Sequence, residues 1–225
     1  MDQIALWSER ILSALQDNNR WMGWNLFLAL VPFGLSLWLF RGSRTRTFLW
    51  WSGVLVFLAF LPNAPYVLTD VIHLIEDIRG RYQSVWIISL VVIPKYFLFV
   101  LVGFQAYVLS LMYLGDYLKR QGFAWAVLST ELVLHALNAV GIYLGRFERF
   151  NSWDLLTQLD SLTNTVLDEL VAKRPVLVMV VTFVIITGLY FLSKTLNLAL
   201  VTYWRTKTNS ESSQKTADRL PEHSG

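Results

Sequence analysis

The chain has 225 residues, of which 55% are hydrophobic and only 16% are charged. About a quarter of a typical soluble domain is charged, so we expect most of this chain to lie in lipid. The net charge of +3 comes from basic residues scattered over loops and tail, which excludes a nucleic-acid footprint, and the lack of cysteine excludes disulfides, thiolate nucleophiles and cysteine-based zinc sites.

Residues 1–20 predict an amphipathic helix that lies at the membrane interface. Its apolar residues recur at helical spacing: Ile4, Trp7, Ile11, Leu12 and Leu15. The segment lacks the basic start and the apolar core of a signal peptide.

Five apolar stretches predict membrane-spanning helices, each of which needs about 20 residues. They cover residues 21–40, 48–61, 84–114, 124–144 and 176–204. We therefore predict an all-α, polytopic transmembrane helical bundle of five spans.

The third stretch, 84–114, is too long for one crossing, because as a helix it would reach roughly 46 Å. Either it protrudes from the bilayer, or it breaks at Pro94 and provides two of six spans. Six spans remain the alternative to five.

Basic residues predict the orientation. They follow the first span, the third span and the last span: Arg41, Arg44, Arg46, Lys119, Arg120, Arg205 and Lys207. The positive-inside rule makes these segments cytoplasmic. Five spans then place the N-terminus outside, the C-terminus in the cytoplasm, and both 62–83 and 145–174 on the outer face; six spans would put the last two on opposite sides.

Two further segments lie outside the spans. Leucines at helical spacing predict a second interfacial helix over residues 152–170. The tail, 205–225, is polar and poor in apolar residues, so we expect it to be disordered. An internal sequence repeat is the usual signature of an inverted-repeat transporter. The chain has no such repeat.

The first polar motif begins where Pro62 and Pro65 interrupt a membrane helix. Asp70, His73 and Asp77 follow at positions i, i+3 and i+7, on one face of a helix. An imidazole between two carboxylates suits acid–base catalysis or a divalent metal, and a solvated helix end explains the pattern equally. A single histidine is a weak metal signature, so we expect no metal and no cofactor.

The second motif lies near the centre of the fourth span. Glu131, His135 and Asn138 stand at i, i+4 and i+7, and ionisable residues at such depth face the protein interior and find a partner. We expect Lys95, at about the same predicted depth, to pair with Glu131. This intramembrane network is either a functional relay or a polar clamp between helices.

The third motif, residues 145–154, lies at the outer end of the same span. Arg146 and Arg149 are one turn apart, so they either bind an anionic group bidentately or reach lipid phosphates. Asn151 and Asp154 follow directly.

The strings Leu-Pro-Asn-Ala-Pro-Tyr at 61–66 and Gly-Arg-Phe at 145–147 resemble motifs of the bacterial membrane family called domain of unknown function 1361. The resemblance covers the apolar body of the chain. It implies a multi-pass protein of the bacterial plasma (inner) membrane and no particular activity. The matched positions are Pro62, Asn63, Pro65, Tyr66, Asp70, His73, Arg146, Arg149, Asn151, Trp153 and Asp154.

Together the motifs predict an outward-facing polar pocket built from Asp70, His73, Asp77, Arg146 and Arg149, over the buried network of Lys95, Glu131 and His135. Its expected ligand-binding residues are Asn63, Tyr66, Arg146, Arg149, Asn151 and Asp154. Motifs of nucleotide hydrolysis, serine hydrolases and zinc proteases are missing, so the leading interpretation is a non-enzymatic membrane component. The expected partners are the bilayer and a lipid head group, lipid-linked ligand, peptide or protein.

Two alternatives stay open. One is an enzyme acting on a lipid-linked substrate, with His73 as the base and Asp70 or Asp77 beside it. The other is a small transporter or channel subunit that uses Glu131 and His135. The sequence leaves the oligomeric state open.

Overall fold

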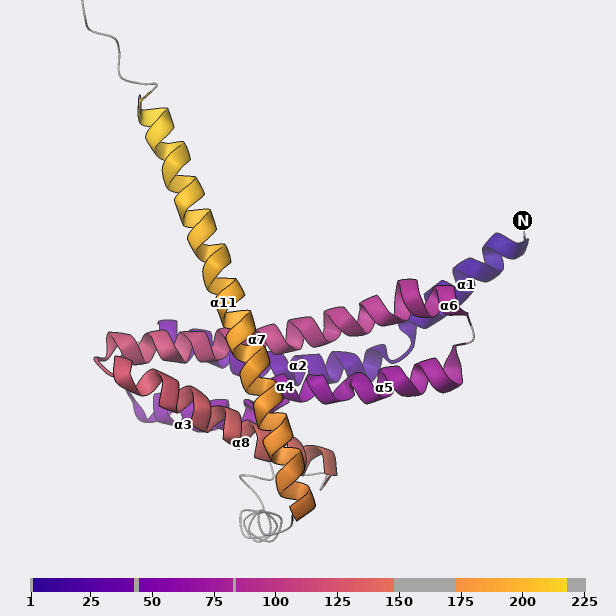
Figure 1. The fold of residues 1–225 in the computed structure, drawn as a ribbon, viewed down its shortest axis with the longest axis horizontal. Helices are drawn as coiled ribbons and strands as arrows, with labels where there is room; N and C mark the ends of the chain where they lie inside the picture. Colours follow the sequence, from indigo (N-terminus) through magenta and orange to yellow (C-terminus); the bar gives the residue numbers. More distant parts are fainter. Residues whose placement is uncertain (1, 43–44, 83, 148–172, 218–225) are drawn as a thin grey trace, which may run out of the picture.

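The computed structural model describes residues 2–42, 45–82, 84–147 and 173–217 (Figure 1). Within these ranges every regular element is a helix and none is a strand, which confirms the all-α class. Five helical stretches there are long and apolar enough to cross a membrane: Leu6–Gly42, Phe48–Arg81, Val85–Arg120, Ala124–Arg146 and Lys173–Ser210. Each predicted span coincides with one of them, and only the third, 84–114, begins one residue earlier than its helix.

The first long helix has a joint near its start. Helix α1 (Asp2–Gln16) is followed by α2 (Asn19–Ser36) and the π-helical η1 (Leu37–Gly42). Between α1 and α2, Asn18 has a φ of 65°, a left-handed conformation that asparagine tolerates better than most residues. The interfacial location of α1 stays a prediction.

The second long helix changes its winding at the two prolines. It consists of α3 (Phe48–Phe60), α4 (Asn63–Tyr66), the 3-10 turn η2 (Val67–Asp70), α5 (Val71–Glu76) and the π-helical η3 (Asp77–Arg81). Proline lacks the N–H that a helix interior needs, so the α-helix ends before Pro62 and restarts in short turns.

Two glycines let this proline segment lie deep between neighbouring helices. A Cβ added at Gly141 would stand 2.9 Å from the Pro62 ring, and one at Gly103 would stand 2.8 Å from Val67. Both distances are too short for real Cβ contacts. The glycines therefore fix the position of the segment that carries Asp70.

The third long helix runs through Pro94 without a break. It consists of α6 (Val85–Ile87), the π-helical η4 (Ile88–Val92) and α7 (Ile93–Arg120). Pro94 is at the start of α7, where a missing N–H is tolerated, and the wider π turn precedes it. The structure thus favours five spans over six.

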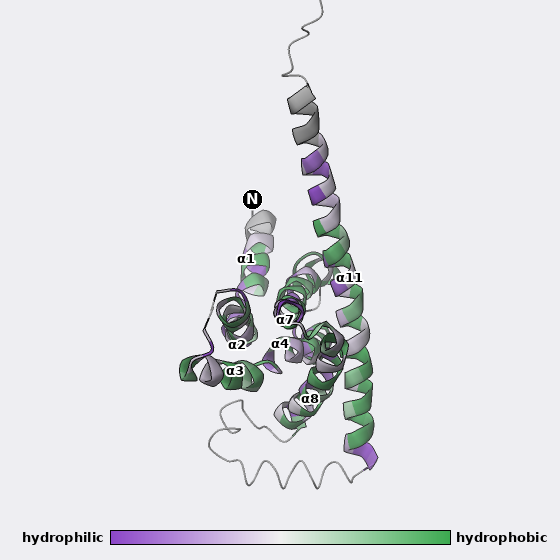
Figure 2. Ribbon diagram, turned by 90° about the vertical axis from the view of Figure 1, so that its left-hand side faces the viewer, coloured by the Kyte–Doolittle hydropathy of each residue, from purple (hydrophilic) through white to green (hydrophobic). Residues whose placement is uncertain are grey.

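The last two long helices are η5 (Ala124–Ala126) with α8 (Val127–Phe147), and α11 (Lys173–Ala217). Helix α11 crosses one side of the bundle and packs on α8 and α7 (Figures 1 and 2). It is apolar over most of its length and turns hydrophilic toward its C-terminal end (Figure 2).

Helix α11 also continues beyond the predicted span. The sequence predicts disorder from residue 205, whereas the helix reaches Ala217, and no proline or glycine lies between these positions to end it. The remainder of the tail, 218–225, and the predicted interfacial helix 152–170 lie outside the described residues.

Contacts at the helix ends show that successive helices run antiparallel. At one end Arg46 donates to Gln121 (2.5 Å), which joins the loops after η1 and α7. At the other end Arg81 donates to Asn18 (3.2 Å), which joins the end of η3 to the α1–α2 joint. The two polar ends lie on opposite sides of the apolar bundle.

Candidate functional site

The predicted polar residues form three separate clusters, of which the first joins two sequence motifs. Asp70 is buried, with 1% of its surface exposed. Its Oδ2 accepts a hydrogen bond from Asn25 Nδ2 of α2 (3.0 Å), and its Oδ1 lies 3.7 Å from Nη1 of Arg146 at the end of α8. The structure therefore brings Asp70 and Arg146 together, as the predicted pocket requires.

Arg146 is held loosely in this cluster. Its guanidinium donates to the Tyr66 hydroxyl and to the Thr69 carbonyl, both at 3.4 Å, and its side chain is 21% exposed. These distances exceed the usual range of about 2.7–3.2 Å. A guanidinium has five N–H donors, so Arg146 keeps hydrogen-bonding capacity for a further acceptor.

Asp70 is also incompletely satisfied. Its buried Oδ1 has no hydrogen-bond partner among the described residues, although Arg146 lies within ion-pair distance. A buried carboxylate oxygen without a hydrogen bond is energetically unfavourable. The cluster therefore holds an ion pair whose two halves both lack optimal partners.

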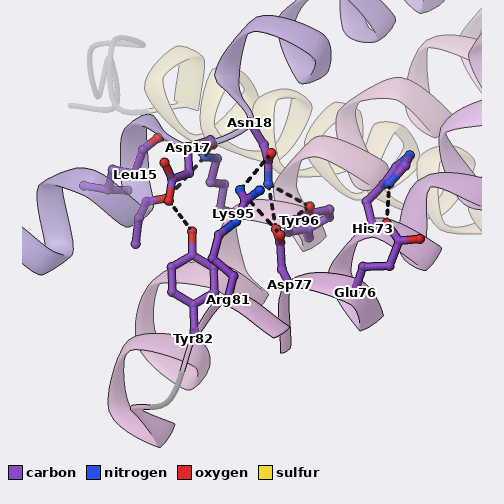
Figure 3. Close-up of polar contacts among 11 residues, drawn as sticks. Leu15, Asp17, Asn18, His73, Glu76, Asp77, Arg81, Tyr82, Lys95 and Tyr96 are labelled. Carbon is purple, nitrogen blue, oxygen red and sulfur yellow. Dashed lines mark hydrogen bonds and ion pairs between the residues drawn. The ribbon is translucent and has the colours of Figure 1, made fainter. Parts of the chain in front are cut away.

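The second cluster surrounds Asp77 at the opposite end of α5 (Figure 3). Asp77 Oδ2 accepts hydrogen bonds from Asn18 Nδ2 (2.6 Å) and the Tyr96 hydroxyl (2.8 Å). Arg81 Nη1 lies 3.6 Å from Asp77 Oδ1 and also donates to Asn18. These bonds join the α1–α2 joint, η3 and α7.

Beside it, Tyr82 donates a hydrogen bond to Asp17 Oδ2 (2.8 Å, Figure 3). Burial raises the pKa of the Tyr82 hydroxyl to about 12, and the hydrogen bond to Asp17 adds to the effect. The neutral hydroxyl is therefore the form that this structure stabilises.

Lys95 belongs to the second cluster and not to the Glu131 network. Its ammonium group donates to the Leu15 carbonyl (2.9 Å) and to the carbonyls of Ala14 and Asp17, at the C-terminal end of α1 (Figure 3). A cation at this position satisfies unpaired carbonyls and the helix dipole.

The predicted Lys95–Glu131 pair is therefore wrong. Lys95 is near the start of α7 and Glu131 is near the start of α8, and these consecutive helices are antiparallel. The two residues consequently lie toward opposite ends of the bundle.

His73 does not stand between two carboxylates. Its Nδ1 is 3.0 Å from Glu76 Oε2, and its ring packs on Trp21 with 4.8 Å between centroids. The three predicted residues do not form one hydrogen-bonded unit, because Asp70 contacts Asn25 and Arg146 whereas Asp77 contacts Asn18 and Tyr96. The described residues contain no group of three acidic, histidine or cysteine side chains that could hold a metal.

The third cluster is the most deeply buried. Glu131 Oε1 accepts a hydrogen bond from the Tyr190 hydroxyl (2.7 Å) and pairs with Lys194 Nζ (2.6 Å), both on α11. Lys194 is the one charged residue in the apolar stretch 176–204, so a search of the sequence for paired intramembrane charges could have found it.

His135 and Asn138 lie one and two turns along α8 from Glu131. Asn138 Nδ2 donates to the Tyr107 hydroxyl (3.1 Å), which lies 2.6 Å from His135 Nδ1. We assign the Tyr107 hydrogen to this contact, which puts the ring proton of His135 on Nε2. That nitrogen is buried and has no hydrogen-bond partner among the described residues.

The remaining predicted site residues are distributed as follows. Tyr66 contacts Arg146, and Asn63 donates to the Phe60 carbonyl within its own helix (3.0 Å). Arg149, Asn151 and Asp154 lie outside the described residues. Sequence reasoning did not anticipate Asn25, Tyr96, Tyr107 and Tyr190, because uncharged residues in apolar helices carry no distinctive pattern.

The apolar helices and their buried ion pairs define a multi-pass α-helical membrane protein. The chain belongs to the family described as "Protein of unknown function (DUF1361)", whose family model matches residues 24–187. It matches none of the curated proteins and none of the solved structures with which it was compared. The matched residues include all of the Asp70–Arg146 cluster.

Proposed function

We propose that this protein is a non-enzymatic membrane component that binds an anionic group at Arg146. The observation that carries the proposal is the weak binding of the guanidinium, whose closest contacts among the described residues are at 3.4 Å and whose side chain is 21% exposed. A phosphate or carboxylate on a lipid head group, a peptide or a partner protein has the geometry to accept two of its N–H groups.

Asp70 gives the site an internal competitor for the ligand. In the free protein its carboxylate neutralises Arg146, which otherwise would be a partly desolvated and unpaired charge. A ligand with two well-placed oxygens offers closer hydrogen bonds than Asp70 does at 3.7 Å. Asn25 holds the other Asp70 oxygen and keeps the carboxylate in place.

The enzymatic alternative has less support. It needs His73 beside Asp70 or Asp77, whereas His73 pairs with Glu76, Asp70 with Asn25 and Arg146, and Asp77 with Asn18 and Tyr96. Among the described residues, the candidate base His73 therefore has no hydrogen bond to Asp70 or Asp77, the carboxylates that would orient it.

The test is calorimetric titration of the purified, detergent-solubilised protein with inorganic phosphate. The variant Arg146→Gln should lose binding, while Arg205→Gln, which changes an exposed arginine of α11, should bind like the wild type. The proposal fails if Arg146→Gln binds as well as the wild type.

Arg146→Gln also leaves Asp70 buried without its counter-charge, so misfolding must be separated from lost binding. The double variant Asp70→Asn, Arg146→Gln removes both charges, so no buried charge is left unpaired, and asparagine keeps the shape of the Asp70 side chain. It should fold like the wild type, by circular dichroism and gel filtration, and still fail to bind phosphate.

A second candidate function is a proton or ion relay through the third cluster. The observation that favours it is the buried His135 Nε2, which has no hydrogen-bond partner in the part of the chain that the structure describes and lies beside the Glu131–Lys194 pair. Proton flux into liposomes that depends on the protein should then disappear in Glu131→Gln, His135→Ala. Flux that survives the double change removes this candidate.

A further inference from the structure

An apolar groove opens at the end of the bundle that carries the η1–α3 loop and the α7–η5 loop, which the hydrogen bond between Arg46 and Gln121 joins. Its volume is about 380 Å³, and it is lined by residues of α3, α7 and α8. Trp50 and Phe57 form its buried wall, Leu134 belongs to its α8 side, and Trp51 and Leu58 form its more exposed edge. The volume falls within the range of about 300–1,000 Å³ that is typical of small-ligand sites.

The outer surface beside the groove is strongly apolar. On α3, Leu49 is 66% exposed, Leu55 is 62% exposed and Trp51 is 56% exposed. A row of exposed large apolar side chains on a membrane-spanning helix faces hydrocarbon. The groove therefore opens toward lipid acyl chains.

The mouth of the groove is basic. Arg46 lines it, is exposed, and is held by a hydrogen bond to Gln121 (2.5 Å) and by the Tyr117 ring at 5.7 Å. Among the described residues, no carboxylate forms an ion pair with Arg46. Its charge is thus available at the point where the groove ends.

Neighbouring groups strengthen the positive charge. Arg41, Lys119 and Arg120 are exposed at the same end of the bundle. In the described residues of the two connections 41–47 and 115–123, the one acidic residue is Asp116, which pairs with Lys119 at 3.4 Å. Exposed tryptophans such as Trp51 are typical of the head-group level of a bilayer. An apolar slot below a basic mouth at this level complements an anionic phospholipid.

We infer that this groove is a specific site for one anionic phospholipid, with an acyl chain in the apolar slot and the head-group phosphate on Arg46. The site is independent of the proposed anion site, since Arg46 and Arg146 lie on different elements and at different parts of the bundle. Gln121 orients the guanidinium, and the Tyr117 ring supports its face.

Native mass spectrometry of the detergent-solubilised protein tests the inference, with palmitoyl-oleoyl phosphatidylglycerol as the probe. The wild type should retain phosphatidylglycerol at this groove, and so should Arg146→Gln. Arg46→Gln removes the phosphate partner and should weaken retention about tenfold, which corresponds to about 1.4 kcal/mol. Leu58→Trp places a larger side chain at the edge of the slot and should weaken retention at least as much.

Each variant has a matched control. Leu55→Trp makes the same change one turn away, on an exposed leucine that does not line the groove, and Arg205→Gln removes an exposed arginine elsewhere. Both controls should retain phosphatidylglycerol like the wild type. Unchanged retention in Arg46→Gln and Leu58→Trp, or equal losses in the controls, would overturn the inference.

The head group is tested separately. Palmitoyl-oleoyl phosphatidylcholine has the same chains and phosphate but no net charge, so it should be retained more weakly than phosphatidylglycerol. Equal retention of the two lipids would contradict the inferred preference of the groove for an anionic head group. Circular dichroism of every variant shows whether a loss of lipid follows from a loss of fold.

Discussion

Lys194 Nζ on α11 lies 2.6 Å from Glu131 Oε1 on α8, and the Glu131 side chain is only 4% exposed. The Tyr190 hydroxyl donates to the same oxygen at 2.7 Å. These contacts connect α11, which crosses the bundle on one side, to the interior polar row of α8. The pair therefore determines where α11 crosses its neighbours.

Removing one half of this pair should destabilise the protein strongly. Glu131→Gln leaves the Lys194 ammonium without its counter-charge, and we expect a loss of about 3 kcal/mol in the free energy of unfolding. The measurement is an unfolding titration with dodecyl sulfate in mixed micelles. Lys119→Gln is the control, since the Lys119 and Asp116 side chains are 56% and 55% exposed, and it should change stability by less than about 1 kcal/mol. Equal effects of the two changes would contradict the structural role of the buried pair.

Lys95 should hold the last turn of α1. In Lys95→Met the carbonyls of Ala14, Leu15 and Asp17 lose their common donor, so the end of α1 should fray. Hydrogen–deuterium exchange of the peptide that contains Asp17 should become about tenfold faster, corresponding to about 1.4 kcal/mol of lost protection. Peptides from the middle of α8 should exchange as in the wild type, and unchanged exchange at Asp17 would exclude the capping role.

Tyr82 should give the protein an alkaline pH dependence. Its pKa is raised from 10.0 to about 12 by burial and by the hydrogen bond to Asp17, so folding favours the neutral hydroxyl. The stabilisation is complete below about pH 10 and is lost as the pH rises toward about 12. Comparing the free energies of unfolding of the wild type and Tyr82→Phe between about pH 9 and 12 isolates this contribution. The difference should shrink as the pH rises; a constant difference would contradict the assignment.

The orientation in the membrane is open to a direct test because the chain has no cysteine. Thr45 and Arg79 are exposed at opposite ends of the second long helix. The positive-inside rule predicts that Arg79→Cys reacts with a membrane-impermeant maleimide in intact cells and that Thr45→Cys reacts only after lysis. The reverse pattern would invert the topology, and labelling of both in intact cells would contradict a membrane-spanning second helix.

Hydrophobic run lengths were sufficient to predict the five long helices, because a membrane span needs a minimum apolar length whatever its partners. The contacts between polar side chains of different helices were harder to predict. Depth along each span was judged without the antiparallel order of α7 and α8, and this error produced the Lys95–Glu131 pair.

Helical spacing alone did not predict the partners of the polar residues. Asp70, His73 and Asp77 stand at the spacing of one helix face, but Asp70 contacts Asn25, His73 contacts Glu76 and Asp77 contacts Asn18. The contact between Asp70 and Arg146 joins residues that are distant in sequence. Only their predicted location on the same side of the membrane suggested this contact. Asn25, which completes that contact, has no sequence signal that distinguishes it from other polar residues in spans.

Phosphate binding to Asp70→Asn tests the anion site most directly. This change removes the internal competitor, keeps the side-chain shape for the bond with Asn25, and leaves Arg146 charged. Calorimetric titration should then show inorganic phosphate binding about tenfold more tightly than to the wild type, a gain of about 1.4 kcal/mol. Unchanged or weaker phosphate binding by folded Asp70→Asn protein would contradict the account, and would leave the Asp70–Arg146 pair as a purely structural contact.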